Sequence, residues 1–141
     1  MKKLLFIAII LFATVEIITL TGCTSPPVAP SAESRFIGKW IMQSAISVST
    51  INGTTTPQTT NFTANDYFEF KGGGVVTLVQ SGVTRTGNWK IENDRVFFTG
   101  TNSMDNTPGW AVLTLTANVQ QFYNKEVTTS STTEFTLNLA K

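Results

Sequence analysis

The feature that most constrains the fold of this chain is the close spacing of its turn signals after residue 35. Short runs rich in Thr, Val, Phe and Ile are separated by residues that favour tight turns. The turn signals are Asn52-Gly53, Gly72-Gly73-Gly74, Ser81-Gly82, Asn93-Asp94 and Ala117-Asn118. Beyond the first 20 residues, no apolar residues recur at helical spacing. The pattern predicts an all-β antiparallel sandwich or barrel.

A two-residue turn at Asn93-Asp94 sets the register of the hairpin around it. Glu92 then lies opposite Arg95, which pairs opposite charges beside the turn. One face of the hairpin collects the apolar side chains of Trp89, Ile91, Val96 and Phe98. A one-residue slip would scramble this sorting, so we expect the apolar face to point into the core.

The first and last predicted strands also alternate between two faces. One face of residues 36–49 carries Phe36, Gly38, Trp40, Met42, Ser44, Ile46 and Val48. The last strand is predicted to point Phe135, Leu137 and Leu139 inward. A strand as long as the first is expected to bend and serve both sides of a closed barrel. Residues 110–116 and 119–125 have no clear inner face and receive no predicted orientation.

The amino terminus has the layout of a secretory signal. Lys2 and Lys3 precede a mostly apolar run over residues 4–20, which is short for a spanning helix. The following Leu20-Thr21-Gly22-Cys23 resembles the lipobox of bacterial lipoproteins. The resemblance implies a signal peptide over residues 1–22 and fatty acyl chains such as palmitate on Cys23. The alternative is a transmembrane anchor, with Cys23 an ordinary thiol.

Residues 23–34 are predicted to hold the lipidated Cys23 and a flexible tether, because residues 24–34 include three prolines and three serines. Residues 35–141 are then long enough for one barrel domain. Among bacterial lipoproteins, an acidic residue after the cysteine retains some in the inner membrane, and Thr24 is not acidic. We therefore expect an outer-membrane anchor facing the periplasm, with surface display as the alternative.

Several short motifs resemble the lipocalins and the wider calycin group, in the form of the bacterial lipocalin-like domain. The motifs are Phe36-Ile37-Gly38-Lys39-Trp40 with its G-x-W opening, Tyr67-Phe68-Glu69-Phe70, Thr86-Gly87-Asn88-Trp89 and Leu137-Asn138-Leu139-Ala140-Lys141. The resemblance implies a lipocalin-like, antiparallel up-and-down β-barrel of eight to nine strands. It also implies a basic side chain from the last strand across the G-x-W tryptophan, which Lys141 would place over Trp40. The chain is much shorter than full-length lipocalins.

The composition argues against several classes of function. The chain has no histidine, and therefore lacks the usual general base and the commonest metal ligand. Carboxylate pairs such as Asp66 and Glu69 are interpreted as solvated surface charges. Charges are scattered singly, so no basic face is available for nucleic acid. We expect no enzyme activity, no catalytic residues, no metal and no cofactor.

Two functions remain. The first is binding of a small hydrophobic or amphipathic molecule at the barrel mouth or in its cavity, with Arg85, Trp89 and Phe98 as the ligand-facing candidates. A bulge at Gly87 would return Arg85 to solvent, and we expect that bulge. The alternative is a filled barrel that binds or inhibits another envelope protein through residues 50–60 and 100–109. An apolar pocket of about 300 Å³ or more favours the ligand, and a packed interior favours the interaction.

Overall fold

The structure is a computed structural model, and it describes residues 31–102, 104–105 and 108–141. The predicted signal peptide over residues 1–22, Cys23 and most of the predicted tether lie outside these residues. Within the described part, no helix is long and apolar enough to cross a membrane.

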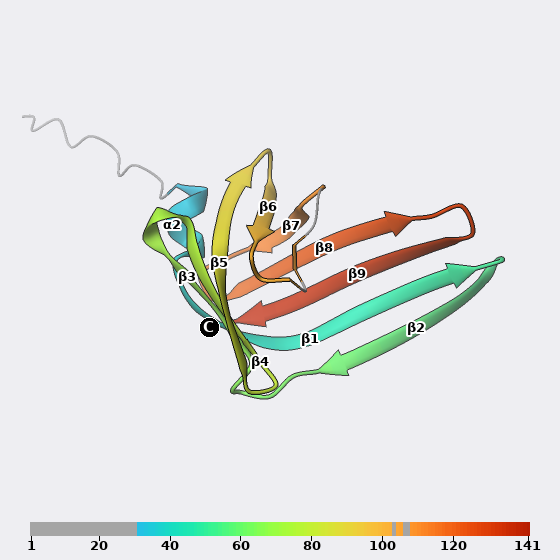
Figure 1. Ribbon diagram of the computed structural model, residues 1–141, viewed down its shortest axis with the longest axis horizontal. Coiled ribbons are helices and arrows are strands. Elements are labelled where there is room, and N and C mark those ends of the chain that lie inside the picture. Colours follow the sequence, from blue (N-terminus) through green and yellow to red (C-terminus); the bar gives the residue numbers. More distant parts are fainter. Residues whose placement is uncertain (1–30, 103, 106–107) are drawn as a thin grey trace, which may run out of the picture.

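Eight antiparallel strands close into a barrel, and a ninth strand lies outside it (Figure 1). The strands are β1 (Gly38–Ile51), β2 (Thr54–Asn61), β3 (Tyr67–Lys71), β4 (Val75–Gln80), β5 (Val83–Glu92), β6 (Arg95–Thr99), β7 (Trp110–Leu115), β8 (Val119–Val127) and β9 (Ser131–Ala140). The order around the barrel is β1-β3-β4-β5-β6-β7-β8-β9, and β9 pairs with β1 to close the ring. The predicted antiparallel barrel of eight to nine strands is confirmed.

A five-residue helix, α2 (Ala32–Phe36), precedes the barrel. Ser31 caps it, because the Ser31 Oγ accepts a hydrogen bond from Ser34 N at 3.1 Å. The helix includes the last residues of the segment that the sequence analysis assigned to the tether. It also includes Phe36, which was expected to open the first strand, whereas β1 begins at Gly38. Phe36 is nevertheless buried, because the helix turns its ring into the barrel.

Aromatic side chains fill the barrel at the end that carries α2. Phe70 lies at the centre of this cluster, with the ring centroids of Trp89 and Phe36 at 5.1 and 5.4 Å in edge-to-face geometry. The centroids of Phe98 and Phe122 lie 6.1 and 6.5 Å from that of Phe70. All five rings are buried, so this end of the barrel is a packed core.

The β5–β6 hairpin and the last strand have the predicted faces. Glu92 lies opposite Arg95, and the positive φ angles of Asn93 and Asp94 provide the tight turn. The inward side chains of both regions are buried or pack against the core: Trp89, Ile91, Val96, Phe98, Phe135, Leu137 and Leu139.

The predicted faces of the first strand are wrong beyond Met42. A β-bulge lies between Met42 and Ser44 where β1 pairs with β9. The extra residue reverses the alternation, so Ala45 pairs with the inward Leu137 and packs against the core. The side chains that the bulge moves to the outer face are Ser44, Ile46 and Val48.

The two segments without a predicted orientation, now β7 and β8, have different irregularities. β7 has a bulge between Val112 and Thr114. On β8 the buried side chains are Phe122 and the flanking amides Gln120 and Asn124. An inner face that mixes two amides with one aromatic ring has no apolar periodicity to detect.

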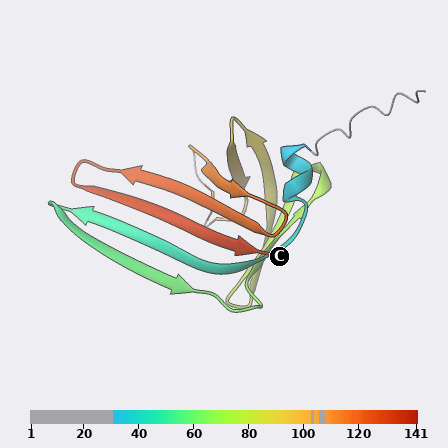
Figure 2. The same ribbon diagram turned by 180° about the vertical axis from the view of Figure 1, so that it is seen from behind.

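Four strands continue beyond the barrel as a sheet that we call the arm, made of residues 46–61 and 125–134 (Figures 1 and 2). The strand order in the arm is β2-β1-β9-β8. No residue of the arm is buried, and all eight residues of β2 are exposed. Both views show the tips of the arm far from α2, at the other end of the molecule. The arm is therefore a single layer with two accessible faces.

Candidate functional site: the barrel mouth and the arm

An apolar pocket of about 160 Å³ opens at the barrel mouth, where the arm leaves the barrel. Its lining includes Met42, Phe62, Met104, Trp110, Phe135 and Leu137. Sites for drug-sized molecules usually measure about 300–1,000 Å³, whereas an engineered apolar cavity of about 150 Å³ binds benzene. The mouth pocket therefore has room for one ring or a short aliphatic chain. Sequence analysis missed Phe62 and Met104, whose only signal is an isolated apolar residue in a polar segment.

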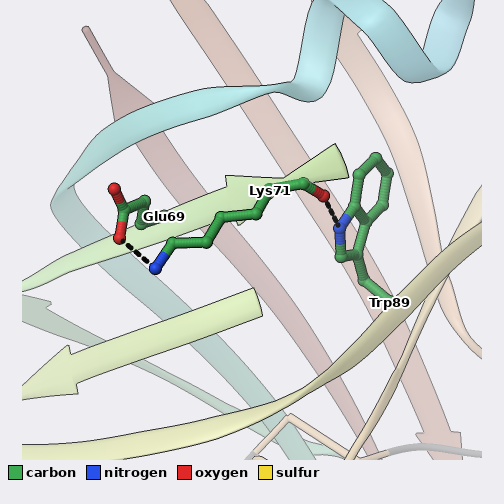
Figure 3. A network of polar contacts seen from close by, with 3 residues as sticks. All are labelled: Glu69, Lys71 and Trp89. Atoms are coloured by element: carbon green, nitrogen blue, oxygen red, sulfur yellow. Dashed lines mark hydrogen bonds and ion pairs between the residues drawn. The ribbon is translucent and has the colours of Figure 1, made fainter. Parts of the chain in front are cut away.

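Trp89 and Phe98, two of the ligand-facing candidates, lie in the aromatic cluster and do not line the mouth pocket. The Trp89 Nε1 donates a hydrogen bond to Lys71 O at 3.2 Å (Figure 3). The Lys71 Nζ in turn lies 3.1 Å from Glu69 Oε2 (Figure 3). The Trp89 side chain therefore fills the core and holds the end of β3.

Arg85 lies on the inward face of β5. The pairing of β4 with β5 continues without a shift and places Arg85 opposite the buried Leu78. The expected bulge at Gly87 is therefore wrong. Glycine is required there because a Cβ would lie 2.2 Å from Thr99 O. Arg85 is half-buried and makes no ion pair within the described residues.

Lys141 and the G-x-W motif meet at the end of the barrel that carries α2. The Lys141 Nζ lies 4.4 Å from the ring centroid of the buried Trp40, the contact that the lipocalin resemblance implies. The Trp40 Nε1 donates a hydrogen bond to Phe36 O at 2.7 Å. Gly38 has a φ of +122°, and a Cβ there would lie 3.5 Å from the Lys141 Cε. That distance is an ordinary contact, so the positive φ, and not the approach of Lys141, is what favours glycine at position 38.

Asp66 holds two loops beside the mouth pocket. Its carboxylate accepts hydrogen bonds from Thr63 N and Oγ1, each at 2.8 Å, and from Ser81 N at 2.6 Å. The bond from Thr63 N, followed by that from Ser81 N, holds the pKa of Asp66 below its ordinary value. The interpretation of Asp66 as a solvated surface charge is wrong, because only 5% of the residue is exposed. Its hydrogen bonds place it in a structural role.

Asp105 holds Gly100 and Thr101 in a similar way. The carboxylate accepts hydrogen bonds from Gly100 N, Thr101 N and Thr101 Oγ1. Burial acts to raise the pKa of Asp105, but the hydrogen bonds, first that from Thr101 Oγ1, outweigh it and lower the pKa. Thr101 and Met104 are buried, whereas Gly100, Asn102, Asp105 and Pro108 are exposed.

Two buried amides on β8 lack hydrogen-bond partners. Gln120 Oε1 and Nε2 and Asn124 Oδ1 have no partner among the described residues. Gln120 is 0% exposed and Asn124 is 2% exposed. A buried polar group without a partner destabilises the fold by about 1–3 kcal/mol. The inner face of β8 therefore carries buried polar atoms that disfavour folding.

The architecture defines a class of protein: a closed antiparallel barrel of eight strands with one extra strand, which is compatible with a calycin-type fold. No protein-family model matches the chain, and no curated protein or solved structure matches it either. Within the described residues, no group of three or more His, Cys, Asp or Glu side chains is placed to hold a metal ion.

Proposed function

We propose that this protein is a lipid-anchored interaction module of the cell envelope and that its arm binds another protein. The observation that supports this proposal is the single-layer arm. A sheet with two accessible faces buries little apolar surface and contributes little to the stability of the barrel. Such a sheet can instead offer its two faces and its free edge to a binding partner.

The free edge that best suits a partner is β2. Edge strands are commonly protected from other chains by charged residues or proline. The opposite edge of the arm carries Lys125 and Glu126, whereas residues 46–61 include no charged side chain. Within β2, Pro57 is the one protecting residue. We expect the partner to add an extended strand beside β2.

Photo-crosslinking in the cells that make the protein tests this proposal. Benzoylphenylalanine replaces Gln58 in the arm or Thr84 on the barrel strand β5, since both side chains are exposed. The proposal predicts a discrete protein adduct from position 58 and none from position 84. Equal adducts from both positions, or none from either, would contradict it.

A matched pair of substitutions tests the mode of binding. Proline on an edge strand directs its nitrogen to solvent, so Thr59, two residues after Pro57, also directs its N–H outward. Thr59→Pro removes that donor and should abolish the adduct, whereas Thr59→Val keeps the N–H and should retain it. An adduct that survives Thr59→Pro would show that the partner contacts a face of the arm rather than its edge.

The anchor is a separate part of the proposal and rests on the lipobox resemblance. Two or three acyl chains on Cys23 would hold the protein durably on the outer membrane, where a single chain would not. Cys23→Ala should give an uncleaved or soluble form. A Cys23→Ala protein that still fractionates as a mature outer-membrane protein would refute lipid attachment at this residue.

The mouth pocket favours a second candidate function, the binding of a small hydrophobic or amphipathic molecule. Its volume of about 160 Å³ suits one ring or a short chain and lies below the range for larger ligands. Toluene and phenol are suitable probes, and Ala45→Leu is the control because it fills the pocket. The candidate predicts an increase in Tm with either probe in the native protein and none in Ala45→Leu.

A further inference from the structure

The chain enters the barrel at a fixed end. Its described part begins at Ser31, beside α2, only eight residues after Cys23. An extended chain spans at most about 3.6 Å per residue, so eight residues reach no farther than about 29 Å. A lipid on Cys23 would therefore keep the α2 end within about 29 Å of the membrane.

The α2 end exposes two large apolar side chains next to a lysine. Ile37 is 37% exposed and Val119 is 46% exposed. The Lys141 Nζ donates a hydrogen bond to Ile37 O at 3.4 Å, and the Lys141 N donates one to Asn118 O at 3.1 Å. These bonds bring the segment after α2, the end of β9 and the start of β8 together. We call the surface formed by Arg35, Ile37, Lys39, Val119 and Lys141 the α2-end face.

Arg35 and Lys141 are the cations of this face that lie nearest Ile37, whereas the Lys39 Nζ lies 3.8 Å from the ring centroid of Tyr67 on β3. Within the described residues, Arg35, Lys39 and Lys141 form no ion pair, whereas Lys71, Lys90 and Lys125 each do. Arg35 donates a hydrogen bond to Leu115 O at 2.7 Å. Glu33 and Glu69 lie on the neighbouring α2 and β3, and Asp94 lines the same pocket as Arg35, so the positive excess is small.

We propose that the α2-end face lies against the phospholipid surface, with Ile37 and Val119 in the headgroup region and Arg35 and Lys141 at anionic headgroups. The proposal rests on the lipid anchor at Cys23. Exposed apolar side chains next to cations suit an anionic interface, where both contribute to binding. The tips of the arm lie at the other end of the molecule and would point away from the membrane (Figure 1).

The two ends of β8 offer a matched pair of probe positions. Val119 begins β8 on the α2-end face, whereas Val127 ends it in the arm, and both are exposed. Val119→Cys or Val127→Cys is introduced into the full-length protein, which has no free thiol once Cys23 is lipidated. Each new thiol is labelled with a fluorophore, and the protein is reconstituted into vesicles of three parts phosphatidylethanolamine and one part phosphatidylglycerol that include brominated lipid.

The proposal predicts at least twofold quenching of the label at position 119 and no quenching at position 127. Added salt should weaken the quenching while the protein still floats with the vesicles, because salt screens the cations. Flotation with equal fluorescence at the two positions would overturn the proposal and leave the anchor intact. Failure to float would refute the anchor, and the proposal with it.

Discussion

The barrel and the arm are built from the same strands but are held together differently. In the barrel, β1 and β9 bury Trp40, Leu137 and Leu139, whereas neither strand buries a residue in the arm. The arm is held by backbone pairing and by short contacts such as Ser49 Oγ to Thr133 Oγ1 at 3.2 Å. Because apolar burial supplies most of the stability of a fold, the difference places stability in the barrel and leaves the arm free for recognition.

The largest expected effect comes from the centre of the aromatic cluster. Phe70→Ala should lower the free energy of unfolding by about 3–5 kcal/mol, because it leaves a cavity among five packed rings. Val48→Ala in the arm should lower it by less than about 1 kcal/mol. Urea unfolding measures both, and Phe70→Leu replaces Phe70→Ala if the latter does not fold. Equal losses of stability at the two positions would contradict the claim that the barrel, and not the arm, carries the stability of the fold.

Replacing the buried amide of Gln120 inside the barrel should stabilise the fold. Gln120→Met keeps the length of the side chain and removes two buried polar atoms without partners. We expect it to raise the free energy of unfolding by about 1–3 kcal/mol. Gln121→Met, on the other face of β8, is the control and should not stabilise, because the Gln121 Nε2 donates a hydrogen bond to Asn138 Oδ1. A loss of stability in Gln120→Met would mean that Gln120 has partners.

The closing contact at the α2 end should have a smaller effect. Lys141→Met removes the ammonium 4.4 Å from the Trp40 centroid and should lower the free energy of unfolding by about 0.5–1 kcal/mol. Lys141→Arg keeps a cation over the ring and should retain most of that stability. Tm measurements compare the two variants, and an equal loss in both would show that the charge does not contribute.

The smallest effect is expected from the exposed ion pair in the arm. The hydrogen bond and charge of Lys125, with Nζ 2.9 Å from Glu134 Oε1, lower the pKa of Glu134. Because the pKa of Glu134 is lower in the folded protein, the ion pair stabilises the fold at pH values above the pKa of the unfolded state. This stabilisation is lost as the pH falls through the pKa of the folded state. Glu134→Gln should therefore reduce the acid dependence of Tm slightly, and only at low salt. An effect that persists at high salt would indicate a less exposed pair.

Prediction from the sequence succeeded where the turn residues and the pattern of apolar side chains indicate the same structure. Asn93-Asp94 and the alternation around it were sufficient to fix the register of the β5–β6 hairpin. The bulge after Met42 has no such signal, because residues 44–49 are small or apolar and include no glycine or proline. A shift of one residue therefore exchanged the faces of the strand without any visible change in the pattern.

The candidate sites were harder to predict than the fold. Residues 50–60 were named as a candidate contact surface, but nothing in their sequence indicates that strands carry them beyond the barrel as part of the arm. The pocket volume depends on how Phe62 and Met104 pack across the barrel mouth, which spacing along the chain does not encode. Arg85 was assigned to solvent because Gly87 resembled a bulge marker, whereas Gly87 instead admits the backbone of Thr99.

Hydrogen exchange of the purified protein tests the central claim, that the barrel carries stability and the arm does not, most directly. The account predicts that amides of β3, β4 and β6 exchange only through global unfolding, with protection that matches the free energy from urea unfolding. Amides of β2 and of residues 125–134 should exchange much faster, through local opening. Protection in the arm equal to that in the barrel would contradict the account.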